Sequence, residues 1–95
     1  MAETRSIPRK FVLRQNYPNP FNPTTNIQYS LPVSGHVSLG VYNILGQSIA
    51  NLVDKDQPAG SYTIRFDAHN LPCGVYIYRL VAGRHTMVKK MMVIK

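Results

Sequence analysis

The sequence predicts an all-β fold, an antiparallel β-sandwich of immunoglobulin-like kind with six to seven strands. Short segments alternate apolar and polar residues, glycine, proline and asparagine separate them at regular intervals, and no segment has a helical period. At 95 residues, of which 44% are hydrophobic, the chain suits one domain with a modest core. With one cysteine and no tryptophan, it lacks the disulfide and buried indole of antibody domains.

The first part of the chain is polar and basic. We expect residues 1–10 to form a flexible linker or an added tail, and residues 11–95 to form the domain. Residues 11–13 are a candidate for a short edge strand, which would be the seventh.

A proline-rich segment follows at residues 16–25, with three prolines in six positions. Proline fixes φ and restricts the residue before it, so this segment is predicted to be extended and kinked. Tyr17 and Phe21 are its expected anchors in the core. A recognition epitope is the alternative, and we favour a rigid loop that closes one end of the core.

Four alternating segments follow, each with an inward set: residues 26–31 (Ile27, Tyr29, Leu31), 36–42 (Val37, Leu39, Val41), 47–53 (Ile49, Leu52, Val53) and 61–67 (Tyr62, Ile64, Phe66). The third alternates poorly, which favours a bulge. Gly40 predicts a close neighbour or a bulge, and Gly46 a turn with positive φ. Residues 54–60 are predicted to be a long polar loop.

The last hairpin is predicted to organise the fold. Its first strand, residues 74–82, places Tyr76, Tyr78 and Leu80 on one face, and Gly83 turns the chain into residues 86–94. Both faces are apolar, so we expect this hairpin to be the central, covered pair of a larger sheet. Either face of the final strand could point inward. Such weak specification allows a strand-exchanged homodimer.

No residue pattern predicts catalysis, a cofactor or a metal site. The three histidines fall on separate segments, and Asp54-Lys55-Asp56 lacks the glycine and distal glutamate of a calcium loop. We therefore expect no enzyme. Carbohydrate binding would need a row of exposed aromatic residues, and the candidates are Tyr42, Tyr76 and Tyr78, although strand tyrosines are more often core residues.

The formal net charge of +7 would suit an anionic partner. The basic residues are dispersed, however, and carry no RNA-binding signature. A solubilising surface is therefore preferred, and no nucleic-acid partner is expected.

Several motifs, taken in order, resemble one family: the type A C-terminal sorting domains of the type IX (Por) secretion system. The opening motif is similar in Tyr17-Pro18-Asn19-Pro20-Phe21-Asn22-Pro23-Thr24-Thr25 with Ile27, Tyr29, Leu31 and Pro32. Later motifs are similar in Val41-Tyr42-Asn43 with Leu45-Gly46, in Gly60 with Phe66-Asp67, and in Asn70-Leu71-Pro72-Cys73-Gly74-Val75-Tyr76. The family usually shows a tryptophan beside the aspartate, where this chain has Phe66.

The resemblance implies an immunoglobulin-like domain that directs an attached cargo protein through the outer membrane to the cell surface, by way of the periplasm. The implied partners are the outer-membrane secretion machinery, a sortase-like peptidase and a covalently fused cargo. The family is also similar to an immunoglobulin-like domain of flagellar hook-capping proteins, so fold alone does not decide function.

The basic and apolar terminus is the expected recognition element of such a signal: Lys89, Lys90, Met91, Met92, Val93, Ile94 and Lys95. Its main chain would lie at a sheet edge, where a partner could add a strand. The alternative is a carbohydrate-binding or structural spacer sandwich appended to a secreted hydrolase.

Overall fold

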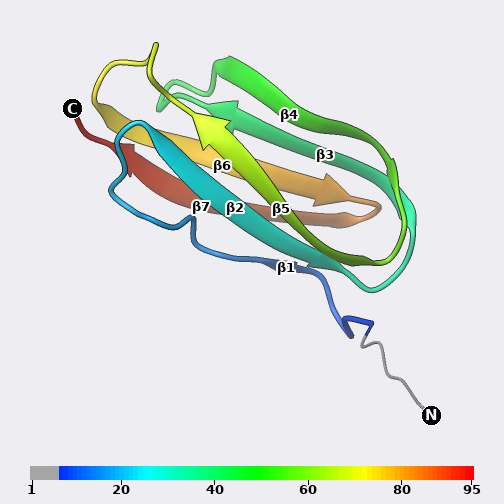
Figure 1. Cartoon of the computed structure of the whole chain (residues 1–95). Helices are drawn as coiled ribbons and strands as arrows, with labels where there is room; N and C mark the ends of the chain where they lie inside the picture. The colour runs from blue at the N-terminus through cyan, green and yellow to red at the C-terminus, as the bar shows by residue number, and fades with distance from the viewer. Residues whose placement is uncertain (1–6) are drawn as a thin grey trace.

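A computed structural model describes residues 7–95 of the chain as an all-β domain (Figure 1). Residues 1–6, which hold most of the expected linker, lie outside the described part. The seven strands are β1 (Val12–Leu13), β2 (Thr24–Leu31), β3 (Gly35–Tyr42), β4 (Ser48–Gln57), β5 (Gly60–Asp67), β6 (Gly74–Ala82) and β7 (His85–Val93). Within residues 7–95, no helix has the length and apolarity needed to cross a membrane.

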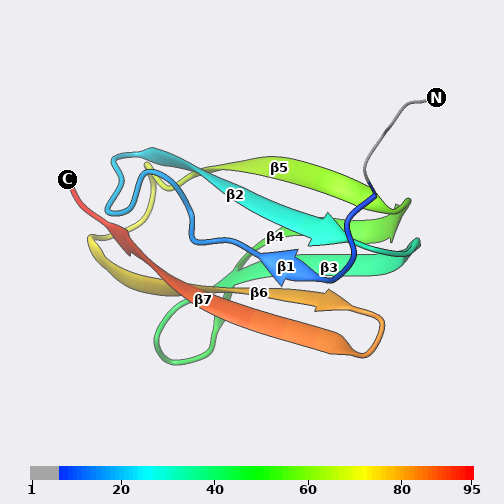
Figure 2. The ribbon, with the colours of Figure 1, turned by 90° about the horizontal axis from the view of Figure 1, so that it is seen from below.

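The strands form two antiparallel sheets that lie face to face (Figure 2). One sheet has the order β1-β2-β5 and the other β4-β3-β6-β7. Lettered A, B, C, C′, E, F and G in chain order, these are the sheets ABE and C′CFG of an immunoglobulin-like sandwich. The prediction of the fold class is confirmed.

The core lies between the sheets and contains most of the side chains predicted to point inward. The inward triplets of β2, β3 and β6 are each at most 6% exposed: Ile27, Tyr29, Leu31, Val37, Leu39, Val41, Tyr76, Tyr78 and Leu80. On β5, Phe66 is buried, while Tyr62 and Ile64 are half-buried against the core. The period-two patterns therefore identified most of the core.

The predicted loop at residues 54–60 is wrong. β4 continues to Gln57 and β5 begins at Gly60, so only two residues connect them. The charged residues of this stretch pair with β3, where the His36 ring lies between the carboxylates of Asp54 and Asp56. An edge strand exposes much of its surface, so its polar composition resembled that of a loop. The expected bulge is present, because the β3–β4 register shifts twice along β4.

The final hairpin differs from its prediction in two ways. β6 is an inner strand but β7 is an edge strand, and the outer face of both is open, with Val75, Val88 and Met92 exposed. The register is regular, with nine residue pairs from Gly74↔Val93 to Ala82↔His85. Met91 and Val93 enter the core, so the odd-numbered residues of β7 face inward.

Two glycine predictions are confirmed by particular contacts. Gly46 closes the β3–β4 turn with φ 82°. At Gly40, a Cβ atom would come within 3.0 Å of the Tyr42 hydroxyl, because the Tyr42 ring lies over this glycine. The Arg79 guanidinium in turn lies 4.7 Å from the Tyr42 ring centroid and donates to its hydroxyl at 2.8 Å.

Candidate recognition site

The proline-rich segment covers the free edge of the C-terminal half of β7. The Phe21 N–H donates to the Met92 carbonyl at 3.0 Å, and the Ile94 N–H donates to the Phe21 carbonyl at 3.0 Å. The Met92 N–H donates to Oδ1 of Asn19 at 2.9 Å. These bonds form a short parallel bridge between Phe21 and Val93. Both figures of the whole chain show this segment beside the end of β7 (Figures 1 and 2).

A polar cluster at the start of the same segment also fixes its shape. The Asn16 amide nitrogen donates to Oγ1 of Thr25 at 3.0 Å and to the Pro18 carbonyl at 3.1 Å, and the Thr25 hydroxyl also donates to that carbonyl. Gln15 donates to the Lys90 carbonyl at 2.6 Å. Prolines supply no N–H groups, so side-chain amides and hydroxyls satisfy the carbonyls of this segment.

Tyr78 connects this cluster to the core. Its hydroxyl donates to the Arg14 carbonyl at 2.6 Å and accepts from the Asn16 N–H at 2.8 Å. Burial raises the pKa of Tyr78 to about 12, opposed by the hydrogen bond from Asn16. The phenol is therefore neutral at physiological pH, as its donating role requires.

The two expected anchors of the segment behave differently. Phe21 is 1% exposed and packs edge-on against Phe66, with ring centroids 6.3 Å apart. The Tyr17 side chain is 80% exposed, so the expectation that it anchors the core is wrong. Its main chain is the anchor instead, because it exchanges two hydrogen bonds with Asn26 of β2.

The expected recognition residues divide between the core and the surface. Met91 and Val93 are 1% exposed and belong to the core, and Lys89 is half-buried. Met92 and Ile94 are 43% and 45% exposed, and Lys90 is also exposed. The Lys95 ammonium donates to the His69 carbonyl at 3.0 Å.

The exposed part forms one basic and apolar patch. Val75 is the neighbour of Met92 across the β6–β7 pair, and a shallow hollow of about 270 Å³ lies against Asn19, Val75, Lys90 and Met92. We call Lys90, Met92, Ile94 and Val75 the terminal surface.

The described part of the chain gives little support to carbohydrate binding or to a metal site. Of the aromatic candidates, Tyr76 and Tyr78 are buried, and the Arg79 contact holds Tyr42 over Gly40, so the three form no exposed row. In residues 7–95 no three histidine, cysteine or acidic side chains gather as a metal site would require.

A family profile described as a secretion system C-terminal sorting domain matches residues 15–95. The chain belongs to this family. Neither a curated protein nor a solved structure matches the chain. The match begins at Gln15 and so includes the whole proline-rich segment, strands β2 to β7 and the terminal surface of the sorting domain.

Membership defines the role of the sorting domain in outline. It is a type IX signal that interacts with the secretion system and implies export to the cell surface or beyond. The family consists of sorting signals rather than catalysts.

Sequence reasoning missed Gln15, Asn16 and Thr25 as supports of the site. The signal that could have revealed Asn16 is its position immediately before a run of X-Pro pairs. There the chain lacks N–H donors, and a side-chain amide can replace them. The link from Gln15 to Lys90 crosses 75 positions and left no local pattern.

Proposed function

We propose that the sorting domain directs a covalently fused cargo through the outer membrane by presenting the terminal surface to the type IX machinery. The domain itself performs no chemistry. Lys90, Met92, Ile94 and Val75 make the contact, while Met91 and Val93 hold the strand in the core. The alternation of exposure at the end of β7 supports this proposal. Met91 and Val93 are buried in the core, while Met92 and the following Ile94 are exposed in the patch.

The covered edge changes how recognition would occur. The machinery cannot pair with the main chain of residues 90–94 while Asn19, Phe21 and Gln15 occupy that edge. Recognition of the folded domain therefore uses the side chains of the terminal surface. The proline-rich segment acts as its support, so the first and last motifs of the chain form one unit.

The described chain begins and ends at opposite ends of the sandwich (Figure 1). This arrangement supports a cargo attached at one end and a signal at the other. We propose that residues 1–10 are the linker in which a sortase-like peptidase cleaves. The exported product would then reach the cell surface without the domain.

The experiment is a reporter carrying a periplasmic signal peptide and this chain at its C-terminus, expressed in a type IX-competent host. Export is measured as the fraction of reporter on the cell surface and in the medium. Lys90→Glu is compared with Lys55→Glu, since both lysines are exposed strand residues but Lys55 lies on β4. A reporter without the chain sets the baseline.

We expect Lys90→Glu to lower export about tenfold, as loss of one charged contact of about 1.4 kcal/mol would. Lys55→Glu should be exported like the parent fusion. Equal export of both variants contradicts the terminal surface as the contact, and export without the chain contradicts the sorting role. Deleting residues 91–95 is a poorer test, because it also removes Met91 and Val93 from the core.

A further inference from the structure

The N-terminal half of β7 has an open main-chain edge. In an antiparallel ladder, alternate residues direct both N–H and C=O to the same side. Met92 directs both groups to the proline-rich segment, so Val88 and Thr86 face the same way. Within residues 7–95, no group donates to or accepts from the outward main chain of these two residues. Val88 is also 54% exposed, and the β6–β7 register here has no bulge.

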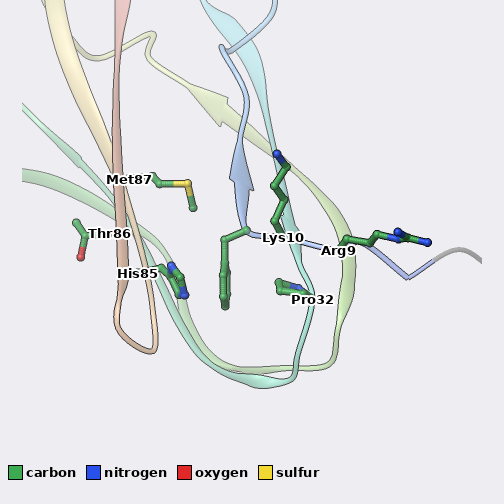
Figure 3. A pocket seen from close by; sticks show the side chains of 7 residues that line it. Arg9, Lys10, Pro32, His85, Thr86 and Met87 are labelled. Atoms are coloured by element: carbon green, nitrogen blue, oxygen red, sulfur yellow. The ribbon is translucent and has the colours of Figure 1, made fainter.

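A hollow lies directly beside this open edge. It has a volume of about 340 Å³ and lies between the start of β1 and the start of β7. Met87 and His85 reach into it from β7, and Lys10 and Arg9 lie on its far side (Figure 3). The Phe11 ring stacks on His85 with centroids 4.0 Å apart and supplies an apolar floor. A strand added to β7 would place one of its side chains in this hollow.

The charges of the molecule are divided between its two sides. The described carboxylates, Asp54, Asp56 and Asp67, all lie on β4 and β5 and contact histidines. Most described lysines and arginines lie instead on or next to β1, β6 and β7: Arg9, Lys10, Arg14, Arg79, Arg84, Lys89, Lys90 and Lys95. In residues 7–95, none of these forms an ion pair with a carboxylate. The three carboxylates of β4 and β5 stand beside two cations, Lys55 and Arg65, so an acidic segment is attracted to the β7 edge rather than to β4 and β5.

From these three observations we propose a second interaction surface, at which an extended acidic segment of another protein adds to β7 alongside Thr86 and Val88. Its main chain pairs with the open edge, and one apolar side chain enters the hollow against Phe11 and Met87. The carboxylates that alternate with it lie on the outward face of the sheet, where Lys90 is exposed on β7 and Arg79 is the neighbour of Val88 across the β6–β7 pair. The surface is distinct from the terminal surface, because the Gln15 bond to Lys90 separates the open edge from the covered one.

The test uses the whole chain and a short synthetic peptide in which valine alternates with glutamate. Binding is measured by titration, and its place by backbone amide shifts in NMR spectra. Val88→Pro removes the outward N–H without touching the β6 ladder, and edge strands tolerate proline at such positions. Val88→Ala is the matched control, because it keeps the N–H and removes only the side chain.

We expect the peptide to shift the amides of Thr86, Met87 and Val88, and Val88→Pro to weaken binding about tenfold or more, as loss of a main-chain hydrogen bond predicts. Val88→Ala should bind nearly like the parent chain. A peptide with lysine in place of glutamate should not bind.

The inference is overturned if the peptide does not bind, if the shifts are confined to β4 or β5, or if Val88→Pro leaves binding unaffected. Binding of vesicles of anionic phospholipid, without binding of the peptide, overturns it as well, because the cations would then serve a membrane surface. The test involves no export, so its failure leaves the sorting proposal untouched.

Discussion

Asn16 is the residue whose side chain holds the proline-rich segment in shape. It is 2% exposed. Its side-chain amide donates hydrogen bonds to Thr25 and to the Pro18 carbonyl, and its main-chain N–H donates to the Tyr78 hydroxyl. Asn16→Ala leaves the Pro18 carbonyl with one donor fewer and opens a small polar void. We expect the free energy of unfolding to fall by about 1–3 kcal/mol.

Urea unfolding of the two proteins measures this change. Gln28→Ala is the control, because Gln28 is an exposed residue of β2. A midpoint for Asn16→Ala equal to that of the control would mean that the cluster does not hold the segment.

Tyr78 makes stability depend on pH in the alkaline range. Its pKa is raised from 10 to about 12 in the folded chain, so the stabilising contribution of its neutral form is present below pH 10. That contribution is lost as pH rises from 10 through about 12. We expect Tyr78→Phe to reduce this alkaline loss while costing about 1–3 kcal/mol at neutral pH, because Arg14 and Asn16 lose their partner.

Unfolding midpoints measured across this pH range check the prediction. Tyr17→Phe, at an exposed ring, should retain the alkaline loss. An unchanged pH profile in Tyr78→Phe would place the titration elsewhere.

His36 is the second residue whose titration has a clear cause. Hydrogen bonds that its ring donates to Asp54, and next to Asp56, raise the pKa of His36 above 6.5. The contribution of the pair to stability is therefore present below pH 6.5 and is lost as pH rises through the raised pKa. In an NMR titration, Asp54→Asn should lower the pKa of His36 and Asp67→Asn should not. No change in Asp54→Asn would show that the ring does not contact this carboxylate in solution.

At the scale of the element, β7 depends on the proline-rich segment for half of its free edge. Asn19 accepts from the Met92 N–H, so Asn19→Ala should expose that amide to solvent. We expect amide hydrogen exchange at Met92 to become about tenfold faster, as a loss of about 1.4 kcal/mol of local protection predicts. The main-chain N–H of Met91 points to β6, so its exchange rate should change less. The amide of Val88, at the open edge, should exchange quickly in both proteins. Equal exchange rates at Met92 would mean that Asn19 does not protect the strand.

Most strands were predictable because their inward residues are apolar and alternate with polar residues that face solvent. Ile27, Tyr29 and Leu31 alternate with polar residues and enter the core as expected. β4 was misjudged beyond Val53, where Asp54, Lys55 and Asp56 suggested a loop. There the main chain of β4 pairs with β3, and the Gln57 side chain is buried and accepts a hydrogen bond from the Tyr29 hydroxyl at 2.5 Å.

The recognition site could be predicted only in part. The resemblance predicted a recognition site in the final residues, but the two possible faces of β7 look alike in sequence. The β6 register and the burial of Met91 and Val93 resolve that choice. The covered edge was not predictable, because it depends on contacts between residues such as Asn19 and Met92, 73 positions apart.

At the scale of the whole molecule, the domain places different functions in different regions. The buried side chains of the two sheets form the core. The proline-rich segment closes the end that carries the C-terminus, and the described carboxylates lie away from β7, on β4 and β5. We therefore predict that fold and signal can be separated by substitution, even within one strand.

Met91 and Met92 offer the sharpest comparison, because they are adjacent residues of the same type with opposite exposure. Met91→Ala should lower the free energy of unfolding by about 2–5 kcal/mol through the cavity it leaves. Met92→Ala should leave stability nearly unchanged, and at such an exposed site any change should be about 0.5 kcal/mol or less.

The decisive measurement is the exported fraction of a reporter fused to Met92→Ala, with its urea midpoint measured in parallel. We predict an unchanged midpoint and export reduced about tenfold, as loss of one apolar contact of about 1.4 kcal/mol implies. Normal export of a stably folded Met92→Ala fusion would contradict the claim that the outward face of the terminal strand is what the secretion machinery reads.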